Sequence, residues 1–200
     1  MNKVNYHKVF LEQIASLTTK PTLLLHVCCG PCASNVIKEL RQYFIITIYY
    51  SNSNIYPLQE YQRRLQELLH FIEEFDPTIK VIEHPYDAKY WLQQVDGSSP
   101  EGGKRCYQCY ELRMKDAYRY ASNHRYDYWT TVLSISPHKN SQWINEIGKD
   151  LTLNEHTQFL FSDFKKDNGY YKSVQLAKEF GLYRQDYCGC IYSYKEKSNR

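Results

Sequence analysis

Runs of strand length alternate along this chain with segments whose apolar residues recur at helical spacing. The clearest strands are predicted at 22–27, a continuous apolar run, and at 44–50, a run rich in β-branched and aromatic residues. Shorter strands are predicted at 79–83, 126–133 and 158–164. Helices are predicted at 8–16, 33–43, 58–75, 88–95, 106–123, 141–153 and 171–180. The alternation is typical of an α/β fold, Rossmann-like, with a parallel sheet of about five strands and helices on both faces.

Length and composition agree with one α/β domain over residues 1–200. A chain of 200 residues and 23.9 kDa can bury about 70% of the surface that its unfolded form exposes, so it needs neither a disulfide nor a metal merely to fold. A metal site in this chain is therefore expected to be functional. The contents of 42% apolar and 24% charged residues exclude a disordered or fibrous chain.

The hydropathy pattern predicts the cellular compartment. No apolar run approaches the roughly 18 residues of a membrane-spanning helix, and residues 1–10 lack the apolar core of a signal peptide. We therefore expect a cytoplasmic protein without membrane association, and we expect a monomer. Seven cysteines in a reducing compartment indicate metal binding or redox chemistry rather than a disulfide scaffold.

The loops that follow the predicted strands are expected to gather at one edge of the sheet. Ligands of parallel sheets bind beyond the carboxyl ends of the strands. The cysteine-containing turn 28–32 follows the first strand, the loop 51–57 follows the second, and the loop 134–140 follows the fourth. These three segments predict a site at that edge. The stretch 96–103, rich in Gly and Ser, is predicted to be a lid or a loop.

Five of the cysteines fall into two clusters. Cys28, Cys29 and Cys32 follow the first strand, whereas Cys106 and Cys109 share one face at the start of a predicted helix. Four thiolates from two such elements can hold a tetrahedral zinc ion or an iron–sulfur cluster, and spacing alone does not choose between them. A Cys-Cys pair directly after a buried strand differs from the hairpins of a structural zinc ribbon, which favours the iron–sulfur cluster.

A third cysteine motif, Cys188-Gly189-Cys190, lies near the C-terminus. A disulfide between residues two apart must bend the backbone, so it would be strained and easily reduced. Such a pair suits a redox relay. The alternative is two exposed thiols or spare metal ligands.

Five linked motifs together resemble the QueH-type epoxyqueuosine reductases, which complete queuosine at the wobble position of tRNA. They are LLHVCCGPCA at 24–33, NIYP at 54–57 with Glu60 and Tyr61, RCxxCY at 105–110 with Arg113, SISP at 134–137, and the segment from Asp163 through the Cys-Gly-Cys motif. The resemblance extends from residue 23 to residue 193. It implies an α/β fold similar to the adenine nucleotide alpha-hydrolases, of HUP type.

The resemblance also implies a cofactor and a reaction. It assigns a [4Fe–4S] cluster to Cys28, Cys29, Cys106 and Cys109. It makes Cys188 and Cys190 a redox-active disulfide and offers Cys32 to one additional adjacent iron. The reaction would be two-electron removal of the epoxide oxygen, with electrons from an external donor. The substrate would be a tRNA with a GUN anticodon that carries epoxyqueuosine.

Proton donors and RNA contacts are nominated by residue type. His138, in a loop at the predicted edge, and Asp163 are the candidate catalytic acids, Tyr110 is a third, and His26, within an apolar strand, is more typical of a core histidine. Basic and aromatic side chains could bind an anticodon loop. The set comprises Arg105, Arg113, Tyr110, Lys165 and Arg184, with Arg63, Arg64, Lys166, Tyr56 and Tyr61 beside them. The 20 tyrosines allow such a surface, but they equally suit half-buried positions.

Three other functions are weighed against the reductase. ATP-dependent activity is disfavoured because Cys-Cys-Gly-Pro-Cys at 28–32 lacks the backbone freedom of a phosphate-binding loop. A zinc-stabilised RNA-binding module would be colourless and turn nothing over. A thiol–disulfide oxidoreductase would need Cys188 and Cys190 yet survive the loss of Cys106 and Cys109.

Overall fold

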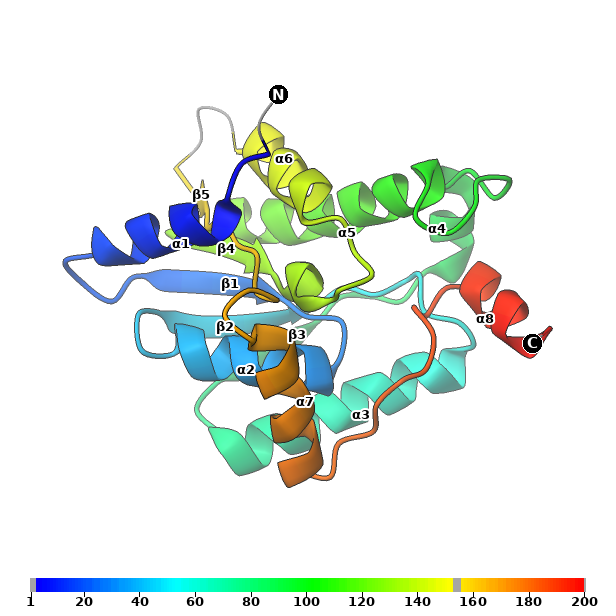
Figure 1. Cartoon of the computed structure of the whole chain (residues 1–200), viewed down its shortest axis with the longest axis horizontal. Helices are drawn as coiled ribbons and strands as arrows, with labels where there is room; N and C mark the ends of the chain where they lie inside the picture. Colours follow the sequence, from blue (N-terminus) through cyan, green and yellow to red (C-terminus); the bar gives the residue numbers. More distant parts are fainter. Residues whose placement is uncertain (1–2, 153–155, 200) are drawn as a thin grey trace.

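A five-stranded parallel sheet lies between helices in the computed structural model, which describes residues 3–152 and 156–199 (Figure 1). The order of the strands across the sheet is β3-β2-β1-β4-β5, and every pair of neighbours is parallel. The predicted α/β architecture is therefore confirmed. The strands are β1 (Thr22–His26), β2 (Ile45–Tyr50), β3 (Lys80–Glu83), β4 (Tyr128–Thr131) and β5 (Gln158–Phe159).

Two groups of helices cover opposite faces of the sheet (Figure 1). On one face α2 (Gly30–Leu40) packs against α3 (Leu58–Phe75) and α7 (Gly169–Glu179), and on the other α5 (Lys104–Asn123) packs against α6 (Ser141–Leu151). The chain thus runs outward from β1 in one direction through β2 and β3, and in the other through β4 and β5. Such a reversal of strand order opens a crevice at the carboxyl ends of the two central strands, here β1 and β4.

The core is built from the strands at the centre of the sheet. Leu23, Leu24 and Leu25 of β1 and Trp129 of β4 are fully buried, as expected for strands covered on both faces. Some of the tyrosines are buried and contact one another through their rings; Tyr49 stacks on Tyr120 with ring centroids 4.7 Å apart. No helix within the described residues is long and apolar enough to cross a membrane.

The edge strand β5 is shorter than the predicted strand 158–164. Helix α1 (Tyr6–Ala15) lies along this edge. The Gln13 amide donates to the Phe159 carbonyl at 3.1 Å and accepts from the Phe161 N–H at 2.9 Å. One side chain therefore covers outward-facing backbone groups of this edge. On the inner side the Thr130 hydroxyl donates to the Leu160 carbonyl at 2.8 Å, in place of a backbone N–H of β4, and pairing ends at Phe159.

Several other boundaries differ from the predictions, most of all those of α2, which begins and ends three residues before the predicted helix 33–43. The strand predicted to reach residue 133 ends at Thr131, whose hydroxyl accepts from the Leu133 N–H at 3.2 Å and so starts the short 3-10 helix η1 (Val132–Ile135). Helix α8 (Ile191–Ser198) was not predicted. Helix α4 (Ala88–Gln94) agrees with its prediction, as does the loop at 96–103. The predicted helix 141–153 ends at Leu151, and residue 153 lies outside the described residues.

Candidate active site

A cavity of about 680 Å³ opens at the carboxyl edge of the sheet, where the crevice between β1 and β4 was expected. Its walls come from the start of α2, the start of α5, the loop after η1 and the segment before α8. Cys32, Cys106 and Cys188 all line it. Each of the three cysteine motifs, which are far apart in sequence, therefore contributes a residue to the same space.

The first motif forms a tight thiol group. The Sγ atoms of Cys28, Cys29 and Cys32 all lie within 4.8 Å of one another, and those of Cys28 and Cys29 are 3.8 Å apart. The group arises where β1 ends and α2 begins at Gly30, with Cys29 as its N-cap. A Cβ at Gly30 would approach the backbone of α3 to 3.0 Å, so only glycine lets α2 start this close to α3. These three thiols could hold a metal ion.

The second pair lies at the start of α5, outside this tight group. Cys109 is buried and packs with Trp91 and Cys190, while the Cys106 sulfur accepts from the Gly102 N–H at 3.2 Å. Burial raises the pKa of the Cys109 thiol to about 12. Arg113, one turn further along α5, is buried, and its charge acts on both Cys109 and Cys28. One guanidinium thus acts electrostatically on both cysteine clusters.

The third motif is a tight turn before α8. Gly189 adopts φ +129°, a conformation that favours glycine. Cys190 is the N-cap residue of α8, and its sulfur lies 3.4 Å from the Ser193 hydroxyl. All seven cysteines carry free thiols in this structure.

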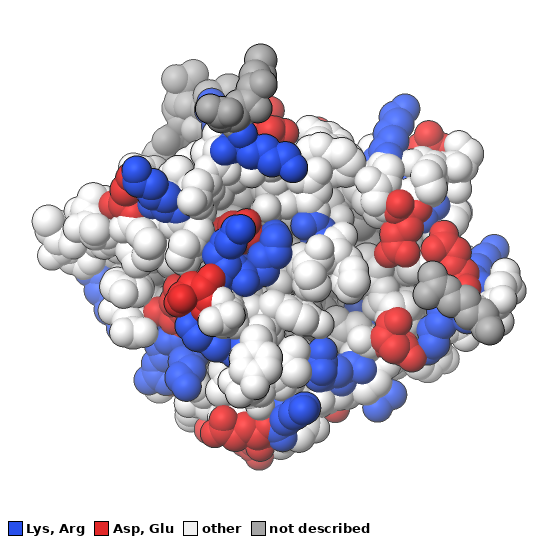
Figure 2. All heavy atoms as spheres, viewed as in Figure 1, with Lys and Arg blue, Asp and Glu red and all other residues white. Residues whose placement is uncertain are grey.

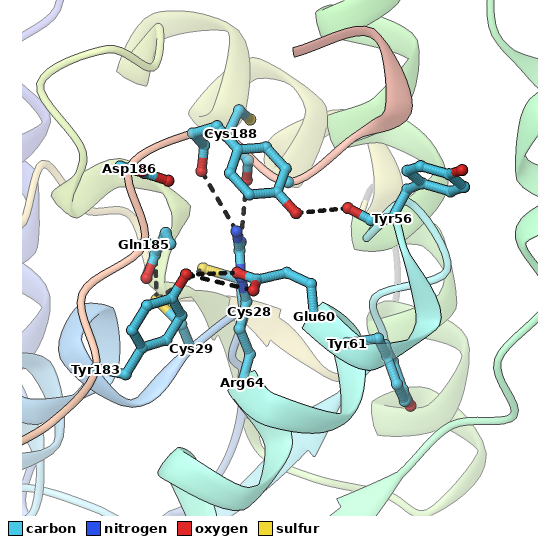
Figure 3. A network of polar contacts seen from close by, with 12 residues as sticks. Cys28, Cys29, Tyr56, Glu60, Tyr61, Arg64, Tyr183, Gln185, Asp186 and Cys188 are labelled. Carbon is cyan, nitrogen blue, oxygen red and sulfur yellow. Dashed lines mark hydrogen bonds and ion pairs between the residues drawn. The ribbon is translucent and has the colours of Figure 1, made fainter. Parts of the chain in front are cut away.

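Cations surround the thiols. The side chain of Arg64 is 2% exposed, and it donates to the Cys188 and Tyr187 carbonyls (Figure 3). Lys139 lines the cavity. Burial alone would lower the pKa of Lys139, but the nearby sulfurs of Cys188 and Cys28 raise it overall. Positive charge gathered in this way stabilises thiolates.

Protonation within the tight group is uneven. Hydrogen bonds from Cys29 and Cys32 hold the pKa of Cys28 well below its usual value. Burial, together with the neighbouring Cys28 sulfur, raises the pKa of Cys29 to about 12. The pKa of Cys32 is also raised, by the sulfurs of Cys28 and Cys29 and by burial. Cys28 is therefore the thiol of this group that ionises first.

His26 is a core histidine, as its strand position suggested. Its side chain is fully buried, with Nδ1 2.7 Å from the Thr131 hydroxyl and Nε2 3.1 Å from the Ser51 carbonyl. Since a carbonyl can only accept, Nε2 carries the proton. Burial and the nearby Arg113 lower the pKa of His26 to about 3. The ring is therefore neutral and holds β1 against its neighbours.

The two predicted catalytic acids occupy different surroundings. His138 is exposed at the rim and lines the cavity. Asp163 is buried, forms an ion pair with Lys165 at 2.6 Å and accepts from the Ser141 hydroxyl at 3.3 Å. Neither Asp163 nor Lys165 lines the cavity. Tyr110 does line it, and burial raises the pKa of its hydroxyl, so Tyr110 remains protonated.

The basic residues nominated for RNA divide into exposed and buried ones. Arg184 is exposed at the cavity. Arg105 is buried, lies 4.3 Å over the Tyr192 ring and donates to the Ser99 carbonyl, which fixes the loop 96–103 to α8. Arg113 is buried with a 2.5 Å hydrogen bond to Asn52. Burial therefore gives Arg105 and Arg113 internal contacts instead of a free surface position.

Two of the flanking candidates, Arg64 and Tyr61, are likewise buried, which corrects the expectation that they lie on an RNA-facing surface. Figure 2 shows Lys and Arg interspersed with Asp and Glu on the face it presents, without one large basic patch. On this face a small number of basic groups therefore stands in place of a broad cationic surface.

The sequence did not predict the positions that three residues occupy at the site. Arg64, Lys139 and Gln185 lie beside the thiols, and the Gln185 amide donates to the Cys29 sulfur at 3.2 Å and to the Cys32 sulfur at 3.7 Å. Gln185 stands within the C-terminal motif that carried the resemblance. Its place in that motif was a signal in the sequence, but the motif did not indicate that Gln185 contacts the thiols.

Comparisons with known proteins agree with the geometry. The family model described as "Epoxyqueuosine reductase QueH" matches residues 23–196. A protein of that name from Streptococcus pyogenes serotype M1 is 41% identical over 203 residues, covering 96% of this chain and 79% of the relative. Proteins of the same name from Staphylococcus aureus and Thermotoga maritima are 38% and 31% identical, covering 96% and 90% of this chain and 84% and 93% of each relative.

Proposed function

Because the chain belongs to the QueH family of epoxyqueuosine reductases, we propose that it reduces epoxyqueuosine to queuosine at the wobble position of tRNAs with a GUN anticodon. In this reaction two electrons and two protons enter, both carbon–oxygen bonds of the epoxide break, a carbon–carbon double bond forms, and water leaves. The observation that carries the proposal is the cavity at the carboxyl edge, which Cys32, Cys106 and Cys188 all line.

The donor set fits an iron–sulfur cofactor. Cysteine thiolates are the usual ligands of such clusters, and the buried guanidinium groups of Arg64 and Arg113 offset the negative charge that the thiolates bring. The proposed ligands of a [4Fe–4S] cluster are Cys28, Cys29, Cys106 and Cys109, with Cys32 available to an additional iron. When bound, the cofactor would supply electrons, and an iron would act as a Lewis acid toward the epoxide oxygen.

The protons are assigned to groups at the cavity. His138 lines the rim, and an imidazole can donate near neutral pH. Tyr110, which stays protonated, would donate a hydrogen bond to the substrate oxygen. Asp163 is engaged by Lys165 and Ser141, so we assign the proton donor to His138 in preference to Asp163.

Cys188 and Cys190 would connect the site to an external electron donor. Cys188 lines the cavity, as does Ser193, whose hydroxyl lies 3.4 Å from the Cys190 sulfur. Oxidation of the two thiols to a disulfide releases two electrons and two protons, which matches the need of one epoxide, and an external reductant then restores the thiols. The pair is thus proposed as the relay of the enzyme.

The tRNA would be held mainly by its phosphates at the cavity rim. Arg184 is exposed there, and Lys139 lies deeper in the same cavity. Anticodon-loop bases are unstacked and can enter a cavity of this size, where an aromatic side chain such as Tyr110 can contact them. The epoxide would thereby reach the thiols.

The test is anaerobic turnover. The protein is reconstituted with iron and sulfide, reduced with dithionite and mixed with tRNA that carries epoxyqueuosine. The RNA is then digested and its nucleosides are weighed by mass spectrometry. We expect the modified nucleoside to lose one oxygen with wild-type protein and to keep it with Cys106→Ser. An unchanged nucleoside with fully loaded wild-type protein would contradict the reductase function.

The same samples separate the two alternatives. A zinc-stabilised RNA-binding module predicts colourless protein that still binds tRNA and converts nothing. A thiol–disulfide oxidoreductase predicts activity toward disulfides that depends on Cys188 and Cys190 and survives Cys106→Ser.

A further inference from the structure

Arg64 of α3 is buried among groups that belong to the C-terminal segment (Figure 3). Its Nε donates to the Glu60 carboxylate at 2.7 Å, one turn earlier on the same helix. Its Nη1 donates to the Cys188 carbonyl at 3.1 Å and its Nη2 to the Tyr187 carbonyl at 3.3 Å. Only a guanidinium has a planar fork of donors that can serve all three acceptors at once.

The same guanidinium faces the first thiol group. Figure 3 shows the guanidinium beside the Cys28 and Cys29 side chains, and although burial lowers the pKa of Arg64, the nearby Cys29 sulfur and Glu60 carboxylate raise it overall. Gln185, three residues before Cys188, adds a direct contact, since its amide donates to the Cys29 sulfur at 3.2 Å. The C-terminal segment is thus attached to α3 and to the first thiol group at neighbouring points.

Further hydrogen bonds hold the backbone of the Cys188-Gly189-Cys190 turn in place. The Gly189 carbonyl accepts from the Tyr56 N–H at 2.8 Å, and the Tyr187 hydroxyl donates to the Tyr56 carbonyl at 2.5 Å. A Cβ at Gly189 would lie 2.9 Å from Arg64 Nη1. The turn and the guanidinium therefore fit against each other only while residue 189 is glycine.

We propose that Arg64 is the positioning residue that fixes the Cys188-Gly189-Cys190 turn against the Cys28, Cys29 and Cys32 thiol group. The inference deepens the proposed function and rests on it for its meaning, because an electron relay needs a constant separation from the cofactor it serves. The contacts of Arg64 that carry it involve protein groups alone. Without Arg64, the turn keeps its covalent chain but loses its anchor to α3.

The test measures each thiol separately. The full-length protein, reduced under anaerobic conditions, is treated with iodoacetamide, and the alkylation rate of every cysteine is followed by peptide mass spectrometry. Arg64→Lys keeps the charge but cannot reach both carbonyls and Glu60. We expect Cys188 to react about tenfold faster, the effect of losing one hydrogen bond from a charged donor, while Cys32 and Cys106 change less than about twofold.

The matched control is Arg41→Lys. Arg41 also pairs with a carboxylate, Asp76 at 3.5 Å, and lies 5.1 Å from an aromatic ring, that of Phe75. It stands at the C-cap of α2, the end of the helix opposite the thiols. All alkylation rates are expected to match those of the wild type.

The redox potential of the Cys188 and Cys190 pair is a second measurement, which a general loss of stability would leave unchanged. The Cys188 residue lines the cavity while the Cys190 sulfur faces Ser193, so a released turn lets the two sulfurs meet more readily. We expect Arg64→Lys to favour the disulfide about tenfold in a glutathione buffer, a midpoint about 30 mV more negative. An unchanged or more positive midpoint would overturn the proposal.

Gly189→Ala disturbs the contact between Arg64 and the turn from the side of the turn. It should accelerate alkylation of Cys188 alone, and the double variant with Arg64→Lys should be no faster than the faster single variant, because both changes break one contact. Rates that multiply, equal acceleration of all cysteines, or an unchanged Cys188 rate would each overturn the proposal. None of these measurements uses epoxyqueuosine, so an inert wild-type enzyme would overturn the proposed function and leave this inference standing.

Discussion

The imidazole of His138 is exposed at the rim of the cavity, whereas the carboxylate of Asp163 is held by Lys165 at 2.6 Å and by Ser141. We predict that His138→Gln lowers kcat by about 10² or more, the usual contribution of a positioned proton donor. Asp163→Asn serves as the control and should lower kcat less than tenfold. Both are measured as anaerobic conversion of epoxyqueuosine in tRNA. A larger loss with Asp163→Asn would reverse the assignment.

The uneven protonation of the first thiol group predicts how it takes up metal. Because burial raises the pKa of Cys29 to about 12, binding must displace protons from thiols at neutral pH. Affinity should therefore rise with pH, by about tenfold per unit for each proton displaced. Titration with Co²⁺ between pH 6.5 and 8 measures this slope, and an affinity independent of pH would contradict it. Cys32→Ala should reduce the slope.

Sequence reasoning at the residue scale could identify the cysteines but not the charges around them. Cysteines are rare and their spacing is informative, so three motifs were assigned to one site, and Cys32, Cys106 and Cys188 do line one cavity. Arg64 differs in no local way from the exposed Arg63 beside it. The side chain of Arg64 is buried because the C-terminal segment folds back over α3, a long-range contact that helical spacing cannot show.

At the scale of elements, the start of β4 is fastened to the start of β1 by one carboxylate. Asp127 accepts from the N–H of Thr22 at 2.8 Å and from its hydroxyl at 2.7 Å. These hydrogen bonds lower the pKa of Asp127 below the ordinary 3.8. The carboxylate therefore stabilises the fold above that pH and loses its contribution as the pH falls through the lowered value.

We predict that Asp127→Asn lowers the free energy of unfolding by about 1 kcal/mol at pH 7, a modest value because the group is half-exposed. Urea unfolding of both proteins at several pH values measures the difference. It should shrink toward zero below the ordinary pKa of an aspartate. A difference that grows on acidification would contradict the assigned role.

The elements themselves were predicted well where burial alone decides them. β1, β2 and the helices α3 and α5 follow the apolar pattern to within two residues at nearly every end. Where the predicted strands 158–164 and 126–133 run too far, side-chain hydrogen bonds are the cause. The Thr130 hydroxyl takes the Leu160 carbonyl where β5 ends, and Thr131 turns the chain into η1. Helix α8 lacks a strong apolar stripe, and only Ser193 in it is buried, so its sequence carries no amphipathic signal.

For the molecule as a whole, the modest formal charge of +3, together with the mixed charges on the face shown in Figure 2, predicts weak, local tRNA binding. We expect the logarithm of the tRNA association constant to fall only gently with the logarithm of salt concentration. Arg184→Ala should reduce that slope by about one phosphate contact, whereas the exposed Arg119→Ala, on α5, should leave it unchanged. Equal slopes for wild type and Arg184→Ala would remove Arg184 from the interface.

The fold gathers three cysteine motifs, more than 150 residues apart in sequence at the extremes, at one edge of one sheet. We propose that the motifs at 28–32 and 106–109 jointly hold one iron–sulfur cofactor. Iron and sulfide content, together with the visible absorption that bleaches on reduction, tests it most directly in wild type, Cys28→Ser, Cys106→Ser and Cys190→Ser. We predict about four irons per chain in the wild type, loss of the absorption in both Cys28→Ser and Cys106→Ser, and its retention in Cys190→Ser. Full iron, sulfide and absorption in Cys106→Ser would contradict the account.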